Sequence, residues 1–126
     1  ESVRLADKAE SHAAALPHGD QRKLEVALLM ALDPKVYLFD EPTAGMSVDE
    51  VPVILDLIRG LKARLRATGK GTILLVEHKM DVVRELADRI IVLHNGQLVA
   101  DGEPAAVIAS TVVQQAYLGM AAEEPA

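Results

Sequence analysis

A short apolar run that ends in two acidic residues places the strongest constraint on the fold. Residues 36–39 are Val, Tyr, Leu and Phe, and Asp40, Glu41 and Pro42 follow them directly. An apolar run of this length, bounded by turn residues, predicts a strand buried on both faces, as in parallel sheets. Proline has no N–H to donate to a ladder, so we expect the strand to end near Glu41. The two acids then lie where open α/β sheets bind ligands.

The two carboxylates suit different tasks at such a strand end. Side chains alternate along a strand, so Asp40 and Glu41 are expected to point in different directions. One carboxylate can hold Mg²⁺ while the other orients or deprotonates an attacking water, as in Mg-nucleotide hydrolysis. The alternative is an acidic loop that merely follows a core strand, and the tetrapeptide alone does not decide between the two.

A second apolar strand is predicted at residues 72–76, after a helix from about Val51 to Arg66. Two strands joined by such a helix predict a right-handed βαβ unit with parallel strands. Glu77 and His78 follow the second strand, so they are expected at the same sheet edge as the first two acids. A histidine there can donate a hydrogen bond to a phosphate; the alternative is a structural histidine that caps the next helix.

The segment Leu16–Arg22 predicts a turn that leads into a helix. Gly19 allows close backbone approach, Asp20 is a good N-cap residue, and the helix would present Leu24 and Leu28 on one apolar face. A glycine-containing turn before a helix N-terminus can bind an anion through free N–H groups and the helix dipole. Most such helix starts bind nothing, so this signal is weak by itself.

The composition limits the classes of function. The chain has 126 residues, a net charge of −6 and no cysteine. The charge argues against a nucleic-acid surface, and the lack of cysteine excludes disulfide and thiolate sites. The apolar runs are too short to span a bilayer, and no leader precedes them, so we expect a cytoplasmic location. Asn95–Gly96 predicts a β-hairpin, and helices are expected after it.

Taken together, these motifs closely resemble the second half of the nucleotide-binding subunit of ABC transporters. The order is the Leu16–Arg22 turn, the Asp40–Glu41 strand end, and Val76-Glu77-His78. The resemblance implies a partial parallel sheet of the P-loop NTPase type flanked by helices, with a C-terminal hairpin and helices. It also implies Asp40 as the Mg²⁺ ligand, with Glu41 and His78 as catalytic residues. The nucleotide-binding signature motif would comprise Leu16, Pro17, His18, Gly19, Asp20 and Gln21.

Two features depart from the family pattern. Pro17 stands where the family has a serine that donates to a phosphate, and Ser47 stands where the turn after the acidic strand usually carries an aspartate. The phosphate-binding motif G-x-x-x-x-G-K-[ST] is absent from these residues. We therefore expect a C-terminal portion of one nucleotide-binding domain, with residues 1–33 ending a helical subdomain and residues 34–126 running from the acidic strand to the last helices.

The resemblance implies hydrolysis of ATP with Mg²⁺ at a head-to-tail dimer of two such subunits, coupled to transmembrane permease subunits. Val-Glu-His at residues 76–78 and Ala-Tyr-Leu-Gly at 116–119 are most like the branched-chain amino acid importers. The subunit would then lie peripherally on the inner face of the cell membrane. Alternatives are a non-hydrolytic half-domain that binds a partner, and a soluble ABC ATPase of another process.

Overall fold

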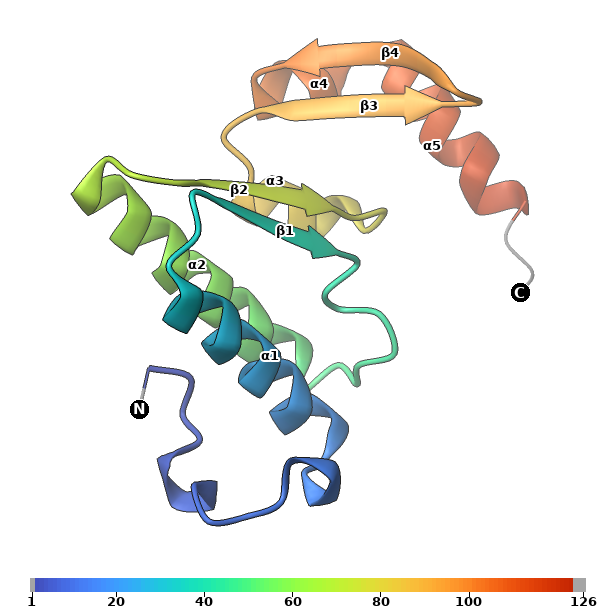
Figure 1. The fold of residues 1–126 in the computed structure, drawn as a ribbon. Helices are drawn as coiled ribbons and strands as arrows, with labels where there is room; N and C mark the ends of the chain where they lie inside the picture. Colours follow the sequence, from blue (N-terminus) through green and yellow to red (C-terminus); the bar gives the residue numbers. More distant parts are fainter. Residues whose placement is uncertain (1, 124–126) are drawn as a thin grey trace. The chain divides into compact units, whose positions relative to one another are not determined.

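The computed structural model describes the backbone of residues 2–123 and the side chains up to residue 117. It divides into two compact units, residues 1–82 and 83–126. From α1 to β3 the helices and strands alternate, as predicted for an α/β fold (Figure 1). Two 3₁₀ turns come first, η1 (Ala6–Lys8) and η2 (Ala13–Ala15). The first unit continues with α1 (His18–Leu32), β1 (Val36–Asp40), α2 (Val51–Thr68), β2 (Thr72–Val76) and the start of α3 (Met80–Leu86).

The first unit contains the predicted βαβ arrangement. Strands β1 and β2 are parallel, and their register pairs Val36 with Thr72 and Asp40 with Val76. Helix α2 connects them, and it buries five apolar residues: Ile54, Leu55, Ile58, Leu61 and Leu65. Gly69 ends the helix in the left-handed conformation, which glycine adopts without steric cost. The expected parallel sheet is therefore confirmed.

The core of this unit lies on one side of the sheet. Tyr37 and Phe39 point into a cluster with Val26 of α1 and Leu61 and Leu65 of α2, and Figure 1 shows both helices along that face. The prediction that the first strand is buried on both faces is wrong within the described residues. The opposite face exposes four apolar side chains: Val36, Leu38, Leu74 and Val76.

Helix α1 begins earlier than expected and buries a different face. It starts at His18, with Pro17 as the N-cap residue, because the Pro17 carbonyl already accepts a hydrogen bond from the Gln21 N–H at 3.0 Å. The prediction of Asp20 as N-cap is therefore wrong. Val26 is buried whereas Leu28 is 60% exposed, so the predicted apolar face also differs from the packed one. The position of the sheet decides which face is covered.

The second unit is built on an antiparallel hairpin. Strands β3 (Ile90–His94) and β4 (Gln97–Gly102) pair through a turn at Asn95 and Gly96, both with positive φ. Positive φ at both central residues is the type I′ geometry that the Asn-Gly pair predicts. Helices α4 (Pro104–Ala109) and α5 (Thr111–Glu123) pack against β4 and each other. The division of one domain at residues 33 and 34 stays a prediction.

Candidate functional site

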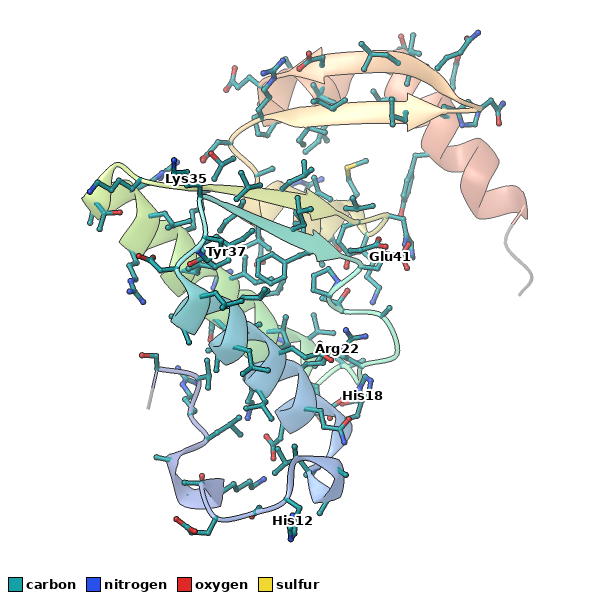
Figure 2. The ribbon with its side chains drawn as sticks, viewed as in Figure 1. His12, His18, Arg22, Lys35, Tyr37 and Glu41 are labelled. Atoms are coloured by element: carbon teal, nitrogen blue, oxygen red, sulfur yellow. The ribbon has the colours of Figure 1, made fainter. Side chains whose placement is uncertain are left out.

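The parallel register of β1 and β2 brings two predicted site segments to one edge of the sheet. Asp40 pairs with Val76 at the C-terminal ends of the strands. The backbone N–H of Glu41 donates to the Val76 carbonyl at 2.8 Å, which extends the pairing by one bond. Glu41 and Glu77 thus leave the sheet side by side, and Figure 2 shows Glu41 at the end of the first strand.

Glu41 and His78 form a direct pair at this edge. His78 Nδ1 lies 3.2 Å from Glu41 Oε1, and both side chains remain close to half exposed. A carboxylate only accepts hydrogen bonds, so this contact places a proton on Nδ1 and leaves Nε2 pointing away from Glu41. Glu41 has a φ of +46°, a left-handed conformation that is uncommon for residues other than glycine. The backbone strain falls on the residue that the sequence singles out as catalytic.

Asp40, the residue before Glu41, lies on the exposed face of strand β1. It is exposed and shares the outer face of β1 with Val36 and Leu38, as the alternation of the strand dictates. No three His, Cys, Asp or Glu side chains gather as metal ligands within the described residues. A single carboxylate at this position suits Mg²⁺, which proteins often hold through one or two carboxylates, with waters and substrate phosphates completing the shell.

Thr43 and Glu77, to which the sequence analysis assigned no role, connect the chain segments that follow β1 and β2. Thr43 is fully buried, and its Oγ1 donates to Glu77 Oε1 at 2.6 Å. The other oxygen of Glu77 accepts from the backbone N–H groups of His78 and Lys79, at 3.2 and 3.4 Å. The position of Glu77 directly before His78 indicated that Glu77 lies at this edge. Nothing in the sequence indicated that Thr43 is its hydrogen-bond partner.

The predicted signature residues lie together at the start of α1. Leu16 precedes the N-cap residue Pro17, and His18 and Gly19 form the first helical turn. Gln21 Nε2 donates to the Leu16 carbonyl at 3.1 Å, which closes the turn from within. Figure 2 shows His18 and Arg22 at this end of the helix. The first N–H groups of a helix have no partner inside it, so this turn can bind an anion.

The Asp20 carboxylate is engaged by two lysine side chains of the protein. It is buried and forms ion pairs with Lys8 and with Lys23, whose Nζ lies 2.9 Å from Oδ1. Hydrogen bonds from Lys8 and then Lys23 hold the pKa of Asp20 below its usual range, and the Asp20 hydrogen bond raises the pKa of Lys8. Asp20 therefore anchors the turn to the η1 segment.

Glu50 links the signature turn to the segment that follows β1. Its Oε2 accepts from the Ser47 backbone N–H at 2.9 Å, and its Oε1 would lie 2.8 Å from a Cβ added at Gly19. Hydrogen bonding from the Ser47 backbone, with smaller contributions that include the Gly19 N–H, lowers the pKa of Glu50. Glycine at position 19 thus leaves room for this carboxylate, a role that local sequence patterns do not indicate.

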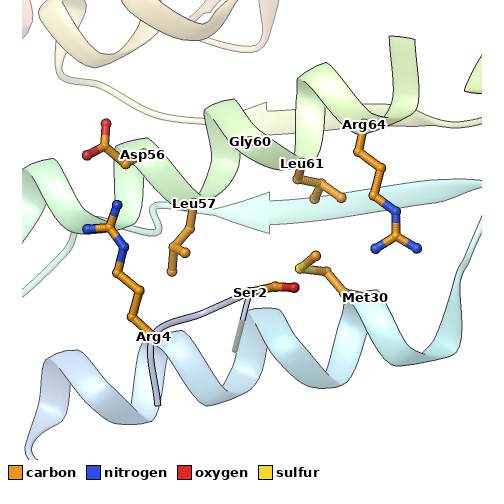
Figure 3. Close-up of a pocket in the computed structure, with 8 residues that line it drawn as sticks. All are labelled: Ser2, Arg4, Met30, Asp56, Leu57, Gly60, Leu61 and Arg64. Carbon is orange, nitrogen blue, oxygen red and sulfur yellow. The ribbon is translucent and has the colours of Figure 1, made fainter. Parts of the chain in front are cut away.

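A cavity of about 270 Å³ lies away from these groups (Figure 3). It opens between the N-terminal segment, α1 and α2, and none of the predicted site residues lines it. Its polar walls come from Arg4, Asp56 and Arg64, and its apolar floor from Met30 and Leu57. The candidate site is therefore identified by the sheet edge and the α1 start, and not by this cavity.

Sequence comparisons find relatives along nearly the whole chain, although no protein-family model matches it. The high-affinity branched-chain amino acid transport ATP-binding protein BraF of Pseudomonas aeruginosa is 38% identical over 121 residues, which are 96% of this chain and 46% of the relative. LivG of Escherichia coli, of the same description, is 39% identical with the same coverage. The methionine import ATP-binding protein MetN of Brucella abortus is 38% identical over 81% of this chain and 27% of its own length.

Solved structures agree with the sequence relatives. An ATP-binding cassette of an ABC transporter in its ADP conformation matches 94% of this chain with a TM-score of 0.78 and 28% identity. A nucleotide-free cassette matches 92% with a TM-score of 0.76 and 26% identity. The chain covers 46% of each of these two structures, and it spans about half the length of BraF and LivG.

Within the described residues no helix combines the length and apolar content needed to cross a membrane. The chain is thus homologous to the ATP-binding proteins of ABC transporters over nearly its whole length.

Proposed function

We propose that this chain is part of the ATP-hydrolysing subunit of an ABC importer. The observation that carries the proposal is the Glu41–His78 contact of 3.2 Å at the C-terminal edge of two parallel strands. This edge is where α/β sheets bind ligands. The identity to transport ATP-binding proteins supports the same conclusion from the whole sequence.

Asp40 is proposed to hold Mg²⁺. Its carboxylate is exposed at the end of β1, next to Glu41 in the sequence. A Mg²⁺ ion held by Asp40 would supply positive charge that offsets the charge developing on the phosphate. Asp40 would keep the nucleotide at the sheet edge within reach of Glu41.

Glu41 and His78 are proposed to act on the attacking water and the terminal phosphate. The Glu41 carboxylate accepts a hydrogen bond from the water and takes its proton as the oxygen attacks the terminal phosphorus. The bond from that phosphorus to the bridging oxygen breaks, and ADP leaves with its electron pair. His78 holds the Glu41 carboxylate through Nδ1, so its Nε2 faces away from Glu41. As an imidazolium, His78 can donate from Nε2 to a phosphate oxygen while Nδ1 keeps its contact.

The signature turn is proposed to serve a second subunit. The N–H groups of the first turn of α1, other than that of Gly19, which donates to Glu50, would meet a phosphate held by the partner of a head-to-tail dimer. Pro17 supplies neither a side-chain donor nor an N–H, so the anion contacts rest on the neighbouring positions. His18 can add a side-chain donor there because it is exposed. The interface therefore needs two copies or two related subunits.

The transported solute is proposed to be a branched-chain amino acid or a related small polar molecule. The similarity to BraF and LivG, both branched-chain amino acid transport ATP-binding proteins, supports this proposal. The subunit would bind transmembrane permease subunits from the inner face of the cell membrane and would not bind nucleic acid. Its net charge of −6 supports the last point.

The proposal is tested by the Mg²⁺-dependent ATPase activity of the full-length protein. Asp40→Asn should weaken both the Mg²⁺ dependence and the nucleotide affinity, by at least the roughly 10–100-fold seen for lost outer-shell partners of metals. Asp7→Asn, in the exposed η1 turn, is the matched control and should leave both unchanged. Nucleotide binding without hydrolysis by the wild type would instead indicate a non-hydrolytic subunit. Leucine uptake by the assembled transporter tests the solute separately.

A further inference from the structure

A partly buried hydrogen bond joins the two segments that carry Glu41 and His78. Thr43 has no solvent exposure, and its Oγ1 donates to Glu77 Oε1 at 2.6 Å. The two residues are 34 positions apart and follow β1 and β2 respectively. Hydrogen bonds to a carboxylate are stronger than neutral ones, and burial from water strengthens them further. This contact therefore fixes the spacing of the two chain segments beyond the last strand pair.

On the Thr43 side, the bond is rigidly connected to Glu41. The Ala44 N–H donates to the Glu41 carbonyl at 3.0 Å, which closes a turn over residues 41–44 with Pro42 at its second position. Proline fixes its own φ and favours this position of a turn. Glu41 itself is held in the left-handed region at the start of the turn. A displacement of Thr43 would therefore be transmitted to the backbone of Glu41.

On the Glu77 side, the bond is connected to His78. The second carboxylate oxygen, Oε2, accepts from the His78 N–H at 3.2 Å and from the Lys79 N–H at 3.4 Å. One carboxylate thus binds the buried threonine with one oxygen and the backbone under His78 with the other. The imidazole of His78 then reaches back to Glu41 at 3.2 Å, which completes a closed ring of contacts.

We propose that Thr43 and Glu77 are positioning residues that set His78 against Glu41. The inference rests on the proposed function, because it assigns these two residues a part in the same hydrolysis. Neither residue is placed at the reacting atoms: Thr43 is fully buried, and both oxygens of Glu77 are engaged by the protein. They act through the geometry of the Glu41–His78 pair, since small misplacements of catalytic groups reduce rates strongly.

Thr43→Val removes the hydroxyl and keeps the shape of the buried side chain. In the full-length protein we expect kcat to fall by roughly ten- to a hundredfold, with the KM for ATP changed little. Thr43→Ser restores the donor and should recover most of the rate. Thr68→Val is the matched control, because the Thr68 hydroxyl bonds the carbonyl of Leu65 in its own helix and the nearby Lys70 N–H, both far from the site residues. Its kcat should equal that of the wild type.

Glu77→Gln provides a second variant that does not depend on a buried substitution. The amide oxygen can still accept from Thr43, but its NH₂ group cannot accept from the N–H groups of His78 and Lys79. We expect a smaller loss of kcat than for Thr43→Val. The amide resonances of His78 and Lys79 should shift in both variants, while those of α2 should not.

The outcomes separate this inference from the proposed function. Absence of ATPase activity in the wild type would contradict the proposed function, while the amide shifts would still test the positioning role. A Thr43→Val protein with wild-type kcat and unshifted His78 and Lys79 amides would overturn the inference. So would a loss of kcat that Thr43→Ser does not recover, because it would indicate a packing effect of the side chain alone.

Discussion

At the scale of single residues, Gly19 is constrained by a carboxylate rather than by its backbone angle. A Cβ at this position would lie 2.8 Å from Glu50 Oε1, which belongs to a flexible side chain. Gly19→Ala should displace Glu50 and disturb both the signature turn and the Ser47 contact. We expect the ATPase rate of the full-length protein to fall by about tenfold, equivalent to ~1.4 kcal/mol in the barrier.

The control for this prediction is a double-mutant cycle. Glu50→Ala removes the clashing carboxylate, so Gly19→Ala should have a much smaller effect in that background than in the wild type. Additive effects of the two substitutions would show that Glu50 is not the reason for glycine at position 19. The phosphate-release rate of all four proteins provides the measurement.

Sequence patterns predicted the positions of Asp40, Glu41 and His78 because each lies at or shortly after the end of a strand that its apolar residues define. They did not predict the contacts of Thr43 and Glu77, which join segments 34 residues apart. Asp20 was predicted as an N-cap residue from its local setting, but its carboxylate forms an ion pair with Lys8, twelve residues away. Local patterns place residues on elements, whereas long-range partners decide what their polar atoms contact.

At the scale of elements, two glycines with open surroundings should respond oppositely to alanine. Neither Gly60 nor Gly96 has any atom within 4 Å of an added Cβ, but Gly60 lies within α2 and Gly96 has a φ of +75°. Gly60→Ala should stabilise the full-length protein by about 0.5–1 kcal/mol, because glycine in a helix has an entropic cost. Gly96→Ala should destabilise it by about 1–2 kcal/mol through the left-handed backbone.

The two variants act as controls for each other in urea denaturation at matched pH. Equal effects of the same sign would contradict the assignment of the β3–β4 turn as type I′. The hairpin was predictable from Asn-Gly alone because the turn geometry requires positive φ at both positions. The start of α1 was less predictable, since the Pro17 carbonyl rather than a polar side chain begins its hydrogen bonding.

At the scale of the whole molecule, one apolar sheet face should govern the behaviour of the isolated chain. Leu38 and Leu74 pair across β1 and β2 and are 65% and 54% exposed. Exposed apolar clusters drive association. We expect the 126-residue chain to associate with further copies as its concentration rises, as measured by light scattering.

Lysine substitutions test this prediction directly. Leu38→Lys combined with Leu74→Lys should reduce the association, because two charges would have to be buried. Leu28→Lys, at a similarly exposed site on α1, is the control and should change it little. A chain that stays monomeric at millimolar concentration would contradict the expectation. The burial of this strand on both faces was predicted from its apolar run, but the run does not show which part of a protein provides the second layer.

The most direct test of the account is the hydrolysis rate of Glu41→Gln in the full-length protein. Glutamine keeps the size of the side chain and its contact with His78 but cannot take the proton of the attacking water. We expect Mg²⁺-dependent phosphate release to fall by ~10²–10⁴-fold while ATP binding is retained. Glu10→Gln, at an exposed position, should match the wild type. Turnover of Glu41→Gln within a few-fold of the wild type would contradict the assignment of Glu41 as the base.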